Sequence, residues 1–75
     1  MKKTYVKVEC QCSEDGAVIP KTIIWHDGRR WTVDRVIHSC ASYNGEFEGI
    51  RYTVKIGSAE KNIYRLGSMW YVDTG

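Results

Sequence analysis

Apolar and polar side chains alternate along much of this chain with a period of two residues, which is the pattern of half-buried β-strands. Residues 4–12 place threonine, valine and cysteine at the even positions, and residues 50–56 place isoleucine, tyrosine and valine there. The residues between them, which include Arg51, Thr53 and Lys55, are expected on the outward face. No segment has a convincing 3.6-residue period, so the pattern predicts strands and no helix.

Turn residues separate the predicted strands. Asp15-Gly16 closes the first strand, Asp27-Gly28 is typical of a two-residue type I′ hairpin, and Gly67-Ser68 fits a two-residue type II′ turn. Pro20 lacks a backbone N–H, which confines the early part of its strand to an edge or a bend. Further strands are predicted between these turns, at residues 18–25, 30–38, 62–66 and 69–73.

Six short strands joined by tight turns predict an all-β fold, in the form of a small five- or six-stranded antiparallel barrel or roll, with an SH3-like barrel as one candidate. The chain has 75 residues, the size of a single small β domain spanning residues 1–75. With 43% hydrophobic residues, a packed core is expected rather than disorder. Residues 40–49, "CASYNGEFEG", are predicted to form a connecting loop.

Charge and cysteine content limit the functional classes. The net charge of +2 is too small to indicate nucleic acid or a membrane surface by itself. No apolar run approaches the ~20 residues of a membrane span, and the basic start "MKKTYVKVECQC" lacks the apolar h-region of a signal peptide. Three cysteines are an odd number, which favours free thiols and a reducing cytoplasm over a disulfide framework.

No catalytic residues are predicted. His26 and His38 are the only histidines, and neither lies in a recognisable nucleophile motif. Paired carboxylates acting as acid and base need a deep cleft, which a barrel of this size rarely supplies. We therefore expect a protein that is not an enzyme and has no cofactor.

A zinc-binding domain is an alternative. Two ligands that are two residues apart on a strand point to the same face, and two such pairs give a Cys₃His set of the kind zinc accepts. The tight Cys-x₂-Cys turn of a zinc knuckle is absent from the sequence, and a cysteine in a strand also fits as a small buried hydrophobe. The candidate ligands are Cys10, Cys12, His38 and Cys40.

Six basic residues are candidates for ligand binding, and several alternate with aromatic residues along the predicted strands. On one shared outer face they would track a phosphate backbone while exposed rings stack on bases. Glu46, Glu48 and Glu60 lie close in sequence to the same strands, so the basic residues also fit a solvated sheet face. Arg51 and Lys55 in particular are expected to be solvent-exposed. The candidates are Arg29, Arg30, Arg35, Arg51, Lys55 and Arg65.

Arg35 lies within a predicted strand at a point where the alternation changes. We favour a β-bulge at Asp34-Arg35, because arginine is rarely fully buried unless it is paired. The bulge would direct Arg35 outward and turn Val36, His38 and Cys40 to the inner face. This irregularity fits either a corner in a closing barrel or a basic group directed at a ligand.

Trp25 and Trp31 flank the Asp27-Gly28 turn. In a two-residue hairpin they would face each other across the strands, and such a cross-strand aromatic pair stabilises strand pairing by up to ~1 kcal/mol. The main role predicted for the segment from Trp25 to Trp31 is therefore to stabilise the hairpin.

Three segments, "IIWHDGRRWTVDRVI", "GIRYTVKIG" and "IYRLGSMWYV", carry a resemblance to a known family. In that family Trp-x-Asp-Gly-Arg opens a hairpin, Asp-Arg-Val follows, and Gly-x-Arg-Tyr-Thr-Val precedes a Trp-aromatic-Val ending. By these motifs the chain resembles a group of small uncharacterised bacterial proteins, found mainly among Firmicutes. That group has no established activity, so the resemblance implies the small fold and a cytoplasmic location, and no site residues.

Two functional classes follow. One is a non-catalytic binding module that docks a protein partner, or a second copy of itself, through an aromatic groove or a free strand edge. The other is an accessory module that binds nucleic acid through a basic sheet face. A continuous basic face would favour nucleic acid, and an apolar groove with mixed charge would favour a protein partner.

Overall fold

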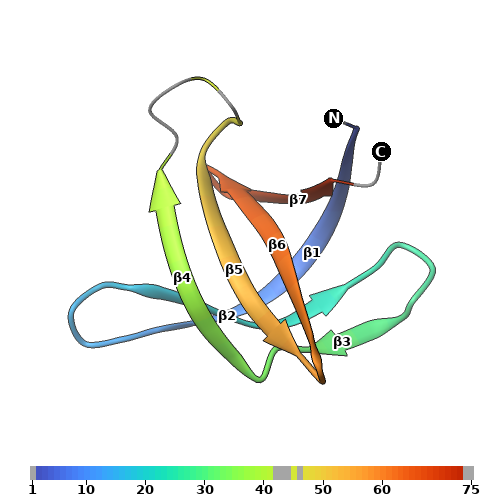
Figure 1. Ribbon diagram of the computed structural model, residues 1–75, viewed down its shortest axis with the longest axis horizontal. Helices are drawn as coiled ribbons and strands as arrows, with labels where there is room; N and C mark the ends of the chain where they lie inside the picture. Colours follow the sequence, from blue (N-terminus) through green and yellow to red (C-terminus); the bar gives the residue numbers. More distant parts are fainter. Residues whose placement is uncertain (1, 42–44, 46, 74–75) are drawn as a thin grey trace.

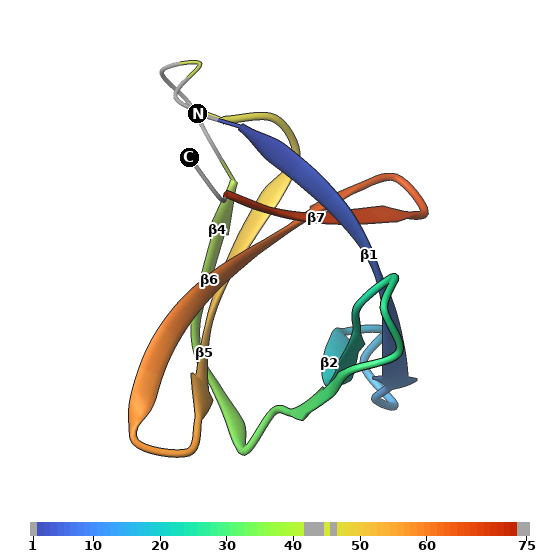
Figure 2. The ribbon, with the colours of Figure 1, turned by 90° about the vertical axis from the view of Figure 1, so that its right-hand side faces the viewer.

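Seven antiparallel strands make up the part of the chain that the computed structural model describes, namely residues 2–41, 45 and 47–73. They form one sheet in the order β3-β2-β1-β7-β6-β5-β4, which curls into a half-barrel (Figure 1, Figure 2). The strands are β1 (Lys3–Cys12), β2 (Val18–Ile24), β3 (Arg30–Thr32), β4 (Arg35–Ala41), β5 (Ile50–Ile56), β6 (Ala59–Leu66) and β7 (Met69–Asp73).

The all-β prediction is confirmed, and no helix that could cross a membrane occurs in the described ranges. The strand count is seven rather than five or six, because the strand predicted at residues 30–38 is divided at Val33 and Asp34. The N–H of Val33 donates to the carbonyl of Lys21, and the N–H of Asp34 donates to the carbonyl of Lys55, each at 2.8 Å. The chain therefore crosses at this point from β2 at one end of the sheet to β5 at the other.

This crossing is the corner that the sequence suggested near Arg35. Arg35 is exposed, as predicted, and Val36 packs against the core. The register shift lies two residues later than predicted, between Val36 and His38, so that His38 pairs with Thr53 and Cys40 with Arg51 on the outer face. The prediction that His38 and Cys40 point inward was wrong for this reason.

The inner face of the curled sheet holds the core. The alternation predicted for residues 50–56 is confirmed, because Tyr52 and Val54 are buried while Ile50 and Ile56 pack against the same cluster from its margin. Burial of this apolar surface supplies most of the stabilisation available to a domain of this size. The buried members of the cluster are Ile23, Val33, Tyr52, Val54, Ile63, Trp70 and Val72.

A second packed layer lies on the outer face, where the sequence pattern predicted solvent. We call Tyr5, Phe47, Tyr64 and Tyr71 the outer aromatic layer. Tyr71 is fully buried and stacks on Tyr64 with ring centroids 4.9 Å apart, while Tyr5 and Phe47 contact this pair edge-on or tilted. The segment before β5 lies over part of this face and contributes Phe47, so Tyr64 of β6 and Tyr71 of β7 are buried although they point outward.

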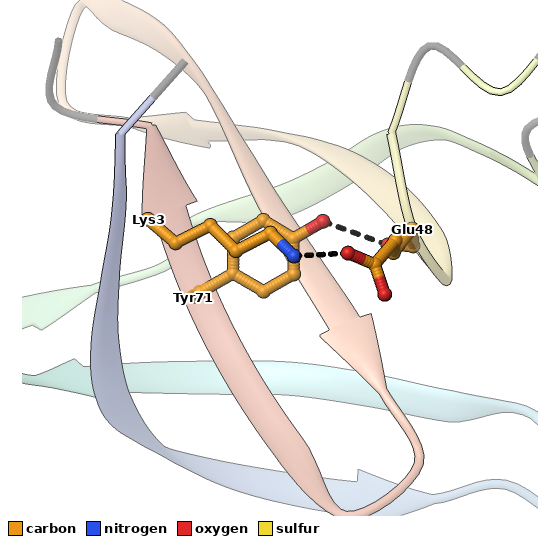
Figure 3. Close-up of polar contacts among 3 residues, drawn as sticks. All are labelled: Lys3, Glu48 and Tyr71. Carbon is orange, nitrogen blue, oxygen red and sulfur yellow. Dashed lines mark hydrogen bonds and ion pairs between the residues drawn. The ribbon is translucent and has the colours of Figure 1, made fainter.

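Three contacts among Lys3, Glu48 and Tyr71 join the outer aromatic layer to the segment before β5 (Figure 3). The Tyr71 hydroxyl donates to the carbonyl of Glu48 at 2.7 Å, and the Lys3 ammonium forms an ion pair with the Glu48 carboxylate. The same ammonium lies 5.1 Å from the centre of the Tyr71 ring. The hydrogen bond to Glu48 raises the pKa of Lys3 above its ordinary value. These contacts join β1, β7 and the segment before β5.

Candidate functional site: a groove beside an open strand edge

β6 has a strand partner on both sides over only part of its length. It pairs with β5 at residues 59–65, but with β7 only at residues 64–66. After Tyr71 the next residues of β7, Val72 and Asp73, keep their pairing with β1 on the other side of β7 and do not pair with β6. Figure 1 shows β6 running away from β7 beyond this point. Within the described part of the chain, residues 59–63 therefore form an open edge.

The turn before β6 determines which backbone groups this open edge presents. Gly57 and Ser58 form a two-residue turn between Ile56 and Ala59, with Gly57 at φ +62°, as the first position of a type II′ turn requires. The pair that flanks such a turn exchanges both backbone hydrogen bonds, and the direction alternates along an antiparallel strand. The N–H and C=O groups of Glu60 and Asn62 therefore point toward the open side.

A groove of about 370 Å³ lies against this edge. Its volume is within the range of ~300–1,000 Å³ that is usual for ligand sites. One wall is the open edge with Tyr64, and the facing wall comes from Ile23, Trp25 and Trp31 of the β2–β3 hairpin, with Val72 and Asp73 at one end. Charged residues of both signs, Glu60, Lys61 and Asp73, line its border.

The two tryptophans of the facing wall contact each other, as predicted, with ring centroids 5.0 Å apart at 60°. The predicted turn type was wrong. The carbonyl of Trp25 accepts from Gly28 at 2.9 Å, its N–H donates to the Arg29 carbonyl at 2.8 Å, and of the turn residues only Gly28 has positive φ. This geometry is a type I turn followed by a glycine bulge. Trp31 therefore pairs with Ile23, and the indoles meet diagonally.

The turn is held by Asp27, whose carboxylate accepts from the Arg29 backbone N–H at 3.1 Å and from the Arg29 Nε at 2.7 Å. The backbone hydrogen bond is the largest of the effects that lower the pKa of Asp27, ahead of the Arg29 side chain. The Arg29 guanidinium also lies 5.5 Å from the centre of the Trp25 ring. The hairpin wall of the groove is thus locally braced.

A carboxyl titration tests this bracing. We expect the pKa of Asp27 to stay below its ordinary value in Arg29→Ala, because that variant keeps the backbone N–H. A carboxylate with a depressed pKa in the folded state contributes stability at neutral pH and loses it as the pH falls below about 4. NMR titration of the Asp27 carboxyl carbon gives the value directly. A return to the ordinary pKa in Arg29→Ala would show that the side-chain charge is the cause.

The six basic candidates do not gather on one face. Arg65 pairs with Ile50 and Trp70, which places it on the inner face of the sheet. Arg30 forms an ion pair with Glu9 at 2.7 Å, while Arg29 is bound to Asp27 in the hairpin turn. The arrangement needed to follow a phosphate backbone, with these residues on one outer face, is therefore not formed.

The remaining basic candidates lie on the outer face of β4 and β5. Arg35 and Lys55 are cross-strand neighbours, and Lys55 is half-buried rather than exposed. Arg51 is also half-buried, which corrects the predicted exposure. Its guanidinium lies 5.0 Å from the centre of the Phe47 ring and 3.6 Å from the Cys40 sulfur through Nη2. Arg51 thus packs beside the outer aromatic layer.

The structure does not assemble the predicted zinc ligands. Cys10 is on β1, where it pairs with the buried Pro20 of β2. His38 and Cys40 lie on the outer face of β4. In the sheet β1 and β4 are separated by β7, β6 and β5. Among the described residues no group of three or more His, Cys, Asp and Glu side chains could hold a metal ion.

The groove residues Glu60, Lys61 and Asn62 were not predicted as site residues. A signal for them exists in the sequence. Gly57-Ser58 is the same dipeptide as Gly67-Ser68. If it is assigned the same two-residue turn, the next strand begins at residue 59. A strand of 8 residues is then followed by one of 5, so the shorter strand cannot pair with the whole of the longer one.

No family model, curated protein or solved structure matches this chain. The resemblance to the small Firmicutes proteins and the cytoplasmic location therefore stay predictions.

Proposed function

We propose that this protein is a non-catalytic binding module that docks a protein partner by adding an extended segment of that partner to the open edge of β6. The proposal rests on one observation, that the open edge and the tryptophan-lined groove coincide. In strand addition the backbone hydrogen bonds supply affinity, and pockets for alternate side chains supply specificity. Glu60 and Asn62 offer the backbone groups, while Trp25 and Trp31 offer an apolar wall.

The charge of the groove also supports a protein partner. Its border carries mixed charge around an apolar wall, which is the pattern that favours a protein partner over nucleic acid.

The alternative of a nucleic-acid module has less support, because Arg65 lies on the inner face and Arg29 and Arg30 are ion-paired. We retain the predictions that the protein is not an enzyme, has no cofactor and works in the cytoplasm on the sequence grounds given above. We also propose that the fold is SH3-like. The support for this is that a small, strongly curled sheet presents aromatic side chains at an opening between strands.

A proline substitution at the open edge tests the proposal. Glu60→Pro removes one edge-facing N–H and adds a ring there, whereas Glu60→Ala keeps the N–H. Peptides selected from a random-peptide phage library against the wild-type protein should bind Glu60→Pro about tenfold or more weakly than Glu60→Ala, through the loss of a backbone hydrogen bond and a steric clash. Calorimetry measures both affinities.

Thermal unfolding provides the control, since proline is tolerated at sheet edges and the two variants should melt at similar temperatures. If every selected peptide binds Glu60→Pro as well as Glu60→Ala, the added strand does not form and the proposed function fails.

A further inference from the structure

We propose that the segment bound at the open edge belongs to a different protein, and that it places an acidic residue opposite Lys61 and a basic residue opposite Glu60. This inference rests on the proposed function and identifies the partner by its chemistry. Lys61 and Glu60 both line the groove and are exposed, and they are adjacent on β6, so their side chains point to opposite faces of the sheet.

A second copy of this chain is the first occupant to consider, because an unpaired edge is a template for pairing with its own kind. Two copies related by a two-fold axis would pair their open edges antiparallel, with the same residues contributed by each. Only Glu60 and Asn62 direct backbone groups outward within the open edge. Symmetric pairing is therefore limited to registers centred on residues 60, 61 or 62.

Each of these registers is unfavourable. The register centred on residue 60 sets Glu60 opposite Glu60 of the second copy, and the register centred on residue 61 sets Lys61 opposite Lys61. Like charges directly opposite each other destabilise an antiparallel pair. The register centred on residue 62 sets Glu60 opposite Tyr64 of the second copy, whose backbone is already paired with Tyr71. The charge pattern of the edge thus argues against self-pairing.

The same pattern specifies what does fit. Side chains directly opposite on neighbouring strands have Cβ atoms ~4.5–5.5 Å apart, so each charge of the edge faces one side chain of the added strand. Lys61 shares the inner face with Ile63 and Val54, and an acidic residue opposite it would complement its charge there. Glu60 lies on the other face, where a basic residue fits. The bound segment therefore carries adjacent residues of opposite charge.

An apolar residue of the segment is expected two positions from the acidic one. Side chains two apart on a strand share a face, so this residue would point into the groove together with the acidic side chain. Trp25 and Trp31 form the wall that it meets. The full chemistry is thus an extended segment with a neighbouring acidic and basic pair and an apolar residue on the acidic side.

A charge reversal at Lys61 tests the inference. A random-peptide phage library is selected in parallel against the wild-type protein, against Lys61→Glu, and against Lys21→Glu as a matched control. Lys21 is exposed on β2 and does not line the groove. Wild type and Lys21→Glu should both select peptides with the adjacent acidic and basic pair. Lys61→Glu should select a basic residue in place of the acidic one and bind the wild-type peptides about tenfold more weakly.

Other outcomes overturn the inference, and they separate it from the proposed function. Selected peptides that are sensitive to Glu60→Pro but show no charge preference at the Lys61 position would refute the inference and leave the proposed function standing. Peptides that are all insensitive to Glu60→Pro would refute both. A dimer of the wild-type protein in sedimentation equilibrium that Glu60→Pro abolishes would show that a second copy is the occupant.

Discussion

Gly49→Ala is expected to destabilise this protein far more than Gly16→Ala, although the two glycines have nearly the same backbone conformation. Gly49 has φ +85° and Gly16 has φ +86°, so both substitutions carry the same left-handed strain of ~1–2 kcal/mol. A Cβ at Gly49 would lie 2.0 Å from the backbone oxygen of Arg65, whereas a Cβ at Gly16 meets nothing within 4 Å. Overpacking against backbone costs a further ~1–3 kcal/mol.

Denaturant unfolding followed by tryptophan fluorescence measures both variants. Typical stabilities per residue give a domain of this size roughly 4–11 kcal/mol, so Gly49→Ala should lose a large part of its free energy of unfolding while Gly16→Ala stays well folded. Equal losses in the two variants would mean that the segment before β5 does not pack on β6 as described.

Tyr71→Ala is the second substitution with a large expected effect, at about 3–5 kcal/mol. The ring is fully buried between Tyr5 and Tyr64, and it supports the Lys3 ammonium on the outer face. Its removal would leave a cavity in the outer aromatic layer. Tyr71→Phe keeps the ring but leaves the Glu48 carbonyl without its donor, which should cost about 1 kcal/mol.

Tyr5→Ala is the matched control, because Tyr5 touches the same ring but is 47% exposed. We expect a loss of about 1 kcal/mol for this variant, since half-exposed side chains carry less packing energy. Thermal and denaturant unfolding give the three values on one scale. A loss for Tyr71→Ala no larger than that for Tyr5→Ala would show that the outer face is solvated and that the sheet has a single core.

The elements that the sequence predicted well are those whose pattern depends on one sheet face alone. The alternation in residues 50–56 identifies β5, and that in residues 4–12 identifies β1, because each has one face against the core. In β1 the predicted alternation holds only as far as Val8, because the register shifts between Glu9 and Cys10 and both Cys10 and Cys12 are exposed. Gly67-Ser68 was predicted as a type II′ turn, and Gly67 at φ +62° between the paired residues Leu66 and Met69 agrees with it. Such features depend on neighbouring residues in the chain, so the sequence alone is enough to predict them.

The outer aromatic layer was not predicted, because alternation says which residues share a face but not what covers that face. Tyr64 and Tyr71 are outward residues by this rule, and both are buried only because the segment with Phe47 and Glu48 folds over them. Arg51 was expected in solvent for the same reason. Burial that depends on a distant segment cannot be derived from a period of two.

The candidate site was missed for a related reason. Trp25 and Trp31 were recognised as a contacting pair, and their contact is confirmed. The open edge arises because β6 and β7 diverge after the Tyr64–Tyr71 pair, while β7 stays paired with β1 on its other side, and sequence pattern does not encode this divergence. The open edge at residues 59–63 is a consequence of tertiary arrangement, although the length difference between β6 and β7 could have indicated it.

Amide hydrogen exchange at Glu60 and Asn62, with and without a selected peptide at saturation, tests the central claim most directly. If an extended segment adds to the open edge of β6, the N–H groups of these two residues gain hydrogen-bond partners and their exchange should slow by at least about tenfold, in contrast to Lys7 and Lys21 outside the groove. Unchanged exchange at Glu60 and Asn62, with new protection around Arg35 and Lys55 on the outer face of β4 and β5, would contradict the account.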